Sequence, residues 1–197
     1  MMALDEKSIY GTHLDEMNRV MGILLERIRA GAKEINERTG MDPVEHLKYR
    51  IKSEESMREK CRRSGLPETE DSALNRLYDG IGLRVVCPFL DDVYAIRDYL
   101  TSQKDIEVVL EKDYIQNVKP NGYRSYHMIV RMNGYHAEIQ IRTISMDTWA
   151  ALEHHIRYKK SIDGNSTLIF EELKRCADEF ASTDASMQTI RSMVREE

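Results

Sequence analysis

The chain has 197 residues, of which 41% are hydrophobic and 32% are charged, and its formal net charge is −5. This length is enough for one hydrophobic core with added helices, and the acidic balance argues against a general nucleic-acid binder. No apolar run approaches the roughly 20 residues of a membrane helix, the N-terminus lacks a signal-peptide pattern, and three widely spaced cysteines favour a reducing cytoplasm.

The first third of the chain predicts two helices and a strand. Apolar residues at three- and four-residue spacing predict a long helix over 12–38. Residues 47–52 alternate apolar and basic side chains, as a strand with one basic edge does. Ser53 is a suitable N-cap for a helix over 54–64, and residues 66–72 are predicted to be a mobile linker.

The rest of the chain predicts four strands and three helices. Strands are expected at 82–89, 106–114, 124–132 and 135–142, and helices at 91–103, 144–160 and 166–195, with a break at Gly164-Asn165. Asp91 or Asp92 is expected to cap the helix over 91–103. This order predicts one α+β domain over 1–197, a mixed sheet flanked by helices, with its core at about 47–160.

The most informative segment is a predicted hairpin about Asn133-Gly134, a dipeptide that strongly favours a type I′ turn. Pairing the two strands across this turn gathers their apolar side chains on one face. The opposite face lacks the mixture of Lys, Glu and Thr that is usual for a solvated strand. It carries Ser125, His127, Glu138, Gln140 and Arg142. We interpret this face as a functional site.

A basic cluster precedes the hairpin, with seven Lys or Arg and three Glu between Lys48 and Arg63. Some of these side chains share a strand face or a helix face and could converge on one ligand, namely Arg50, Lys52, Ser56, Lys60 and Arg63. Arginine offers a planar fork and lysine a compact charge, which together suit a polyphosphate. The alternative is a solvated surface on which neighbouring glutamates neutralise the basic groups.

Two carboxylates are candidate metal-binding or catalytic groups. Asp79 precedes a predicted buried strand beside glycines that let a ligand approach, which suits Mg²⁺; the alternative is an ordinary turn residue. Glu138 lies in mid-strand, where glutamate is disfavoured, on the face of His127. It could hold a metal or accept a proton from a hydroxyl, and the alternative is a pair with Arg142.

The loop before the hairpin is a candidate base-binding element. Pro120-Asn121-Gly122 predicts a tight turn. Tyr123 at its exit could stack on a base, and Asn121 could hydrogen-bond a base edge. The alternative is a loop with a packed tyrosine.

The helices predicted over 12–38 and 166–195 carry near-heptad apolar stripes. One interpretation is that they cover the sheet of their own chain, and the other is that they contact a second subunit. Both can hold at once.

Together these segments resemble the synthetase domain of RelA/SpoT-type alarmone synthetases, and in particular the small single-domain members of the RelQ type. The matching segments keep the order of that family over about 47–160. They are Tyr49-Arg50-Ile51-Lys52-Ser53, Glu59-Lys60-Cys61-Arg62-Arg63, Asp79-Gly80-Ile81-Gly82-Leu83-Arg84, Lys112-Asp113-Tyr114-Ile115, Lys119 with Asn121 through His127, Glu138 through Thr143, and Trp149-Ala150 through Glu153-His154 with Tyr158-Lys159.

The resemblance implies a nucleotidyltransferase-like fold and a Mg²⁺-dependent GTP diphosphokinase. Such an enzyme transfers pyrophosphate from ATP to the 3′-hydroxyl of GTP or GDP and releases AMP. The resemblance implies that ATP is bound by Arg50, Lys52, Ser56, Lys60, Arg63 and Arg84. It implies Mg²⁺ binding by Asp79 and Glu138, with Glu138 activating the acceptor hydroxyl. It implies acceptor binding by Lys112, Lys119, Asn121, Tyr123, Ser125, His127, Gln140 and Arg142, with Tyr123 stacked on guanine.

The resemblance also bears on partners. Small members that resemble this chain form cytoplasmic homotetramers through terminal helices, and some bind an alarmone or single-stranded RNA at a central cleft. No membrane association is expected. Two other functions remain open at this point: the same fold acting on an adenosine nucleotide or a tRNA 3′ end, and a catalytically silent nucleotide- or RNA-binding module.

Overall fold

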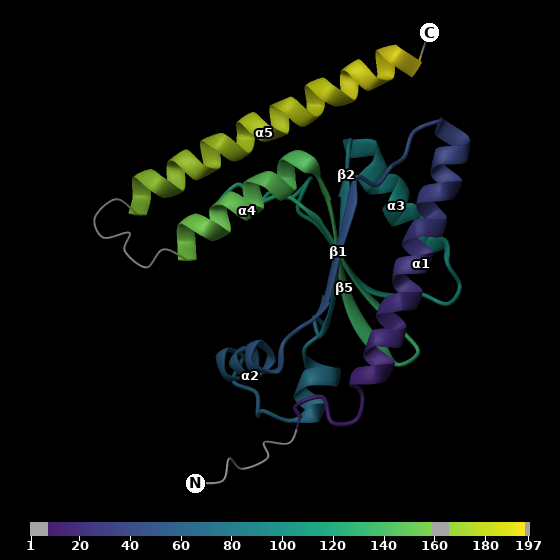
Figure 1. The fold of residues 1–197 in the computed structure, drawn as a ribbon. Helices are drawn as coiled ribbons and strands as arrows, with labels where there is room; N and C mark the ends of the chain where they lie inside the picture. The colour runs from purple at the N-terminus through teal and green to yellow at the C-terminus, as the bar shows by residue number, and fades with distance from the viewer. Residues whose placement is uncertain (1–7, 159–165, 196–197) are drawn as a thin grey trace.

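The computed structural model describes residues 8–158 and 166–195, which form a sheet with helices on both faces (Figure 1). The elements are α1 (Leu14–Thr39), β1 (His46–Ile51), α2 (Glu54–Arg63), η1 (Ser72–Arg76), β2 (Ile81–Cys87), α3 (Leu90–Ser102), β3 (Glu107–Asp113), β4 (Tyr126–Met132), β5 (Tyr135–Thr143), α4 (Ile144–Tyr158) and α5 (Ser166–Arg195). The predicted break at Gly164-Asn165 and the predicted end of the helix over 144–160 lie outside the described residues. The short π-helix η1 was not predicted.

The strand order is β1-β2-β5-β4-β3, which confirms the predicted mixed sheet. Strands β2 and β5 are parallel, and the other neighbouring pairs are antiparallel. Helices α1 and α3 cover one face of the sheet, whereas α2, α4 and α5 lie on the other side (Figure 1). The parallel pair therefore lies near the centre of the sheet and brings together segments that are far apart in sequence.

The predicted hairpin forms with the predicted register. Asn133 has φ 50° and Gly134 has φ 87°, so both turn residues occupy the positive-φ region that a type I′ turn requires. Val130 pairs with Ala137 across the two strands, and both side chains are completely buried. The apolar face of the hairpin is thus part of the core, which leaves its polar face on the side of α2 and α4.

The two terminal helices use their apolar stripes differently. The stripe of α1 packs into the core of its own chain, since Met17, Leu24 and Ile28 are at most 2% exposed. Near the start of α5, the Leu173 carbonyl accepts a hydrogen bond from the Trp149 indole at 2.8 Å. Towards the end of α5 the predicted stripe is exposed, and its exposed members are Met187, Ile190 and Val194.

One predicted helix cap is wrong. Helix α3 begins after Phe89, which is its N-cap residue, and no side chain caps this end. Asp91 instead accepts a hydrogen bond from the Gln188 side chain at 2.7 Å, and Asp92 is buried beside Arg191 at 2.7 Å. Both aspartates therefore fasten α5 to α3. By contrast, the Ser53 side chain caps α2 as predicted.

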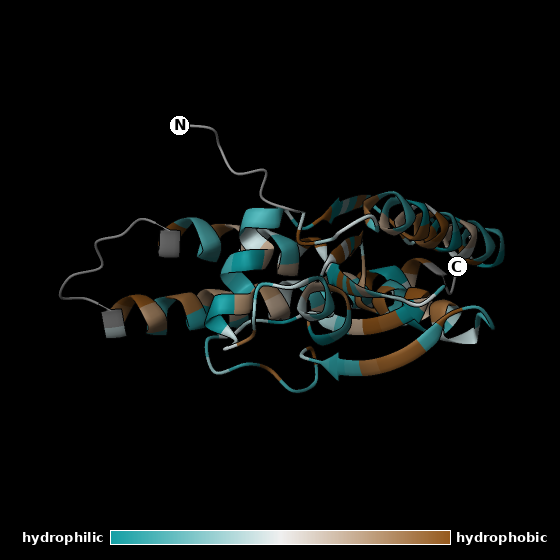
Figure 2. Ribbon diagram, turned by 90° about the horizontal axis from the view of Figure 1, so that it is seen from below, coloured by the Kyte–Doolittle hydropathy of each residue, from teal (hydrophilic) through white to brown (hydrophobic). Residues whose placement is uncertain are grey.

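Hydrophobic and hydrophilic segments alternate along the helices (Figure 2). Across the ranges that the structure describes, no helix combines the length and the apolar character needed to cross a bilayer. Many of the buried apolar side chains pack in the core between the sheet and α1.

Candidate active site

The register of the sheet places predicted site residues in rows on one face. Arg50 of β1 is opposite Gly82 of β2, and Gly82 is opposite Glu138 of β5. Because Gly82 has no side chain, the space between the Arg50 guanidinium and the Glu138 carboxylate stays open. The next row crosses all five strands and contains Lys48, Arg84, Gln140, His127 and Lys112.

This face lines a cavity of about 590 Å³ between the sheet and α4. The predicted residues that line it come from both proposed nucleotide sites and are Arg50, Lys52, Asp79, Arg84, Tyr123, Glu138, Gln140 and Arg142. The lining also includes polar residues that were not predicted, among them Lys48, Glu153, His154 and His155. Tertiary structure thus brings the β1 part of the basic cluster and part of the polar hairpin face to a single cavity.

Asp79 lies just before β2, between two lysines. Its Oδ2 atom is 2.6 Å from Lys52 Nζ and 2.6 Å from Lys60 Nζ. Its Oδ1 atom is buried and accepts no hydrogen bond from any residue that the structure describes. Burial raises the pKa of Asp79, but the hydrogen bonds from the lysines outweigh burial and hold the pKa below its ordinary value. The carboxylate is therefore ionised near neutral pH, with one oxygen available to a further ligand.

Glu138 faces the same cavity from the middle of β5. Its Oε1 atom is 3.3 Å from His127 Nδ1, and its Oε2 atom accepts a hydrogen bond from Gln140 Nε2 at 3.0 Å. Burial raises the pKa of Glu138, the hydrogen bond to His127 lowers it, and the net pKa is below the ordinary value. The nearby negative charge of Asp79 raises the pKa of Glu138, opposite to the effect of His127. Glu138 is thus held as an ionised carboxylate that faces the cavity.

Tyr123 is held by a network of polar contacts. Its Oη atom is 2.7 Å from His127 Nε2 and accepts a hydrogen bond from Arg142 Nη2 at 2.6 Å. The Asn121 side chain accepts a hydrogen bond from the Tyr123 backbone N–H at 3.2 Å. Lys119 Nζ lies 4.9 Å from the centroid of the Tyr123 ring, in cation–π contact. The loop that precedes β4 therefore presents an aromatic ring that is fixed at its hydroxyl.

Several predicted site residues do not line the cavity. Ser56 takes part in the first turn of α2, Arg63 is exposed on that helix, and Lys112 is exposed on the edge strand β3. Ser125 is 0% exposed, and its Oγ atom accepts a hydrogen bond from Arg142 Nε at 3.2 Å. Ser125 thus lies behind Arg142 and supports its guanidinium, and it does not line the cavity.

Comparison with known proteins identifies the family. A family model described as "Region found in RelA / SpoT proteins" matches residues 49–163. The chain belongs to the RelA/SpoT family. GTP pyrophosphokinase YwaC of Bacillus subtilis is 37% identical over 96% of this chain and 90% of its own length.

Solved structures share the fold of this chain. A GTP pyrophosphokinase family protein from Streptococcus pneumoniae has a TM-score of 0.81 at 34% identity, covering 99% of this chain and 97% of that chain. Small alarmone synthetase 1 from Bacillus subtilis, bound to its product pppGpp, has a TM-score of 0.77 at 31% identity, covering 90% of this chain and 94% of that chain. The predicted nucleotidyltransferase-like architecture is confirmed.

Helix α4 brings two acidic residues to this region that were not among the predicted site residues. Asp147 is buried and accepts hydrogen bonds from Arg84 and Arg142. Glu153 lines the cavity, and its Oε1 atom lies 3.5 Å from the Asn121 side-chain nitrogen. An aspartate in the first turn of a helix is common because it complements the helix dipole, so its sequence position did not distinguish Asp147.

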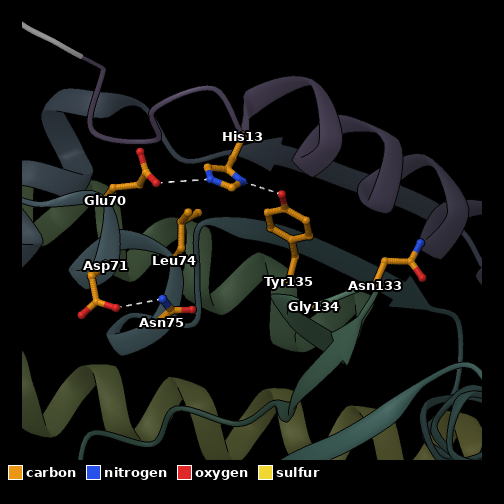
Figure 3. A pocket seen from close by; sticks show the side chains of 8 residues that line it. All are labelled: His13, Glu70, Asp71, Leu74, Asn75, Asn133, Gly134 and Tyr135. Atoms are coloured by element: carbon orange, nitrogen blue, oxygen red, sulfur yellow. Dashed lines mark hydrogen bonds and ion pairs between the residues drawn. The ribbon is translucent and has the colours of Figure 1, made fainter.

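A second cavity of about 450 Å³ lies between the start of α1, η1 and the β4–β5 turn (Figure 3). His13 bridges its two sides, with Nδ1 2.6 Å from Tyr135 Oη and Nε2 3.2 Å from Glu70 Oε1. The residues that line this cavity include none of the predicted site residues. The predicted site residues that line a cavity therefore gather beside α4.

Proposed function

We propose that this chain is a GTP pyrophosphokinase that transfers pyrophosphate from ATP to the 3′-hydroxyl of GTP or GDP. The observation that carries the proposal is the single cavity in which two carboxylates, Asp79 and Glu138, face a basic cluster. The family supports it, since relatives that match most of the chain are named GTP pyrophosphokinases. A RelA/SpoT structure of the same fold is described as bound to its product pppGpp.

The donor half of the proposed site is basic. Arg50, Lys52 and Arg84 line the cavity, and Lys60 reaches it through Asp79. Phosphoryl-type transfer needs charge neutralisation and in-line positioning more than covalent chemistry, so a cluster of guanidinium and ammonium groups suits the ATP phosphates. We propose that Ser56 and Arg63, on the same helix as Lys60, complete this half.

The acceptor half is built around Tyr123. We propose that guanine stacks on this ring and that Lys119, which lies beside the ring, contacts an acceptor phosphate. We propose that Asn121, His127 and Gln140 also contact the acceptor, while Arg142 holds the tyrosine hydroxyl. Lys112 lies in the row of His127 and Gln140 at the far strand, where it can contact acceptor phosphates.

The residues present fit Mg²⁺. Asp79 has a buried carboxylate oxygen that accepts no hydrogen bond from the described residues, and Glu138 faces the same cavity. Within the described ranges there is no group of three or more His, Cys, Asp or Glu side chains that could hold a metal. Mg²⁺ is often held by one or two carboxylates together with substrate phosphates and water, so Asp79 and Glu138 suffice. When bound, Mg²⁺ neutralises charge on the transferred phosphates.

Glu138 supplies the proton transfer. Its carboxylate is ionised and accepts the proton of the acceptor 3′-hydroxyl, while that oxygen forms a bond to the β-phosphorus of ATP. The bond between the β-phosphorus and the α,β-bridging oxygen breaks, and AMP leaves with the bridging oxygen. Arg50, Lys52 and Lys60 hold the phosphates in line during this exchange.

We further propose a homotetramer that acts in the cytoplasm. Because the stripe of α1 is used within its own chain, α5 is the better contact element, with Met187, Ile190, Met193 and Val194 each at least 45% exposed. Binding of an alarmone or single-stranded RNA to such an assembly remains a proposal from the family resemblance.

The activity is tested by incubating the full chain with labelled ATP, Mg²⁺ and, in turn, GMP, GDP, GTP, ADP and a deacylated tRNA. We expect anion-exchange chromatography to show label on GDP or GTP together with AMP. Label on ADP or on a tRNA 3′ end alone would assign the chain to another acceptor, and no transfer to any acceptor would leave only nucleotide binding. Either result overturns the proposal.

A further inference from the structure

Asp147 connects the two halves of the cavity. Its side chain is 9% exposed, and its Oδ1 atom lies 3.0 Å from Arg84 Nη1 and 3.3 Å from Arg142 Nη1. Its Oδ2 atom accepts a hydrogen bond from Lys48 Nζ at 3.1 Å. One carboxylate therefore contacts cations from three strands, β1, β2 and β5.

The two arginines need this anion between them. Burial lowers the pKa of Arg84, and the nearby positive charge of Arg142 lowers it further, so the two guanidinium groups repel each other. The Gln140 Oε1 atom also accepts from both, at 3.3 Å from Arg84 Nε and 2.8 Å from Arg142 Nη2. Gln140 carries no net charge, so Asp147 is the group that offsets the repulsion.

The two arginines serve different substrates in the proposed function. Arg84 shares its row with Lys48 on the donor side. Arg142 extends to the hydroxyl of Tyr123, the proposed platform for the acceptor base. Movement of Asp147 would thus displace the donor clamp and the acceptor platform together.

We propose that Asp147 is a positioning residue that orients Arg84 for ATP and, through Arg142, Tyr123 for the guanine nucleotide. This inference rests on the proposed function. Beyond the proposed function, the inference predicts that one residue outside both nucleotide sites sets the affinity for both substrates.

The test compares Asp147→Ala, Asp147→Asn and Asp147→Glu with the wild type, using full chains and steady-state kinetics. We expect Asp147→Ala to raise the KM for ATP and the KM for GDP about tenfold each, with kcat changed less than about threefold. Asp147→Asn keeps the shape but loses the charge, so its effect is intermediate, and Asp147→Glu restores part of the affinity. Calorimetry with a non-hydrolysable ATP analogue and with GDP measures the same losses as binding constants.

A matched control separates positioning from folding. The Asp92 side chain is also buried, at 3% exposed, and it pairs with Arg191 at 2.7 Å, on the α3–α5 contact outside the cavity. Asp92→Asn should lower Tm and leave both KM values unchanged. The inference is overturned if Asp147→Ala keeps both KM values within about twofold of wild type. It is also overturned if the KM rises for one substrate alone. If Asp147→Ala does not fold, the isosteric Asp147→Asn decides in the same way. A wild type inactive with GDP and GTP would instead refute the proposed function.

Discussion

Lys60 Nζ lies 2.6 Å from Asp79 Oδ2, although one residue belongs to α2 and the other precedes β2. Lys52 reaches the same oxygen at the same distance. The two lysines that we propose for the ATP phosphates therefore pair with the carboxylate that we propose for Mg²⁺. ATP must compete with Asp79 for these ammonium groups, which makes the basic cluster and the acidic pair one electrostatic unit.

The first prediction concerns Lys60. Lys60→Ala removes an ammonium group from the donor half, so we expect the KM for ATP to rise about tenfold to a hundredfold and the KM for GDP to change little. Initial-rate measurements with each substrate varied in turn provide the check. Lys33→Ala, which removes an exposed ammonium from α1 beside Glu37, is the control and should behave as wild type. An equal rise in both KM values would contradict the assignment.

The second prediction concerns Glu138. Glu138→Gln keeps the shape of the side chain but removes its ability to accept a proton, so kcat should fall by about 10²- to 10⁴-fold. Tm and the affinity for a non-hydrolysable ATP analogue should stay close to wild type. Glu107→Gln, at an exposed position on β3 paired with Arg131, is the control. Turnover near the wild-type rate in Glu138→Gln would exclude a role as base.

The third prediction separates the ring of Tyr123 from its hydroxyl. Tyr123→Ala removes the stacking surface, and we expect the KM for GDP to rise about tenfold or more while the KM for ATP changes little. Tyr123→Phe keeps the ring and loses the contacts to His127 and Arg142, so its effect should be smaller. The two variants are compared by kinetics with GDP and ATP. Equal loss for both nucleotides in Tyr123→Ala would count against stacking.

The fourth prediction concerns Gly122, which fixes the acceptor loop against α5. Its φ is +88°, and an added Cβ would lie 2.6 Å from Ala177 Cβ and 3.3 Å from Lys174 Cα. Gly122→Ala therefore adds overpacking to backbone strain, and we expect a loss of about 2–4 kcal/mol in unfolding free energy together with a higher KM for GDP.

Gly40 provides a matched control for this loss. Its φ is +73°, but an added Cβ meets nothing within 4 Å, so Gly40→Ala reports the backbone strain alone, about 1 kcal/mol. Combining Ala177→Gly with Gly122→Ala should recover the part of the unfolding free energy that Gly122→Ala loses through overpacking. Denaturant unfolding measures the unfolding free energy of the wild type, the two single alanine variants and the double variant. Equal losses for the two single alanine variants would show that the loop does not press against α5.

The fifth prediction concerns pH. Burial raises the pKa of Asp147, but the hydrogen bond from Lys48 and the charges of Arg84 and Arg142 outweigh burial and hold the pKa below its ordinary value of 3.8. Asp79 and Glu138 are shifted in the same direction. The unfolded chain therefore binds protons first as the pH falls below the ordinary carboxyl values, and the unfolding free energy decreases through that acidic window.

Thermal unfolding followed by circular dichroism, from about pH 7 to about pH 3, measures this decrease. Asp147→Asn lacks one of the shifted carboxyls, so its Tm should depend less steeply on pH below about pH 5 than the wild-type Tm. Parallel curves for the two chains would mean that Asp147 does not contribute to the pH dependence.

The sequence by itself determined the strands, the helices other than η1, and the hairpin that carries half of the site. Turn chemistry and side-chain alternation act within a few residues, so Asn133-Gly134 and its flanks were enough to predict the register that places His127 and Glu138 on one face. The N-cap at Ser53 was predictable for the same reason, because its hydrogen bond closes within one turn.

Only the tertiary structure decided which charges meet. The parallel pairing of β2 with β5 places Gly82 opposite Glu138, and the packing of α4 on the sheet brings Asp147 to Arg84 and Arg142. It also buried Ser125 beneath Arg142. The partner of a buried charge lies in a segment far away in the sequence. Short-range patterns of residue type carry no information about which distant segments meet in the fold.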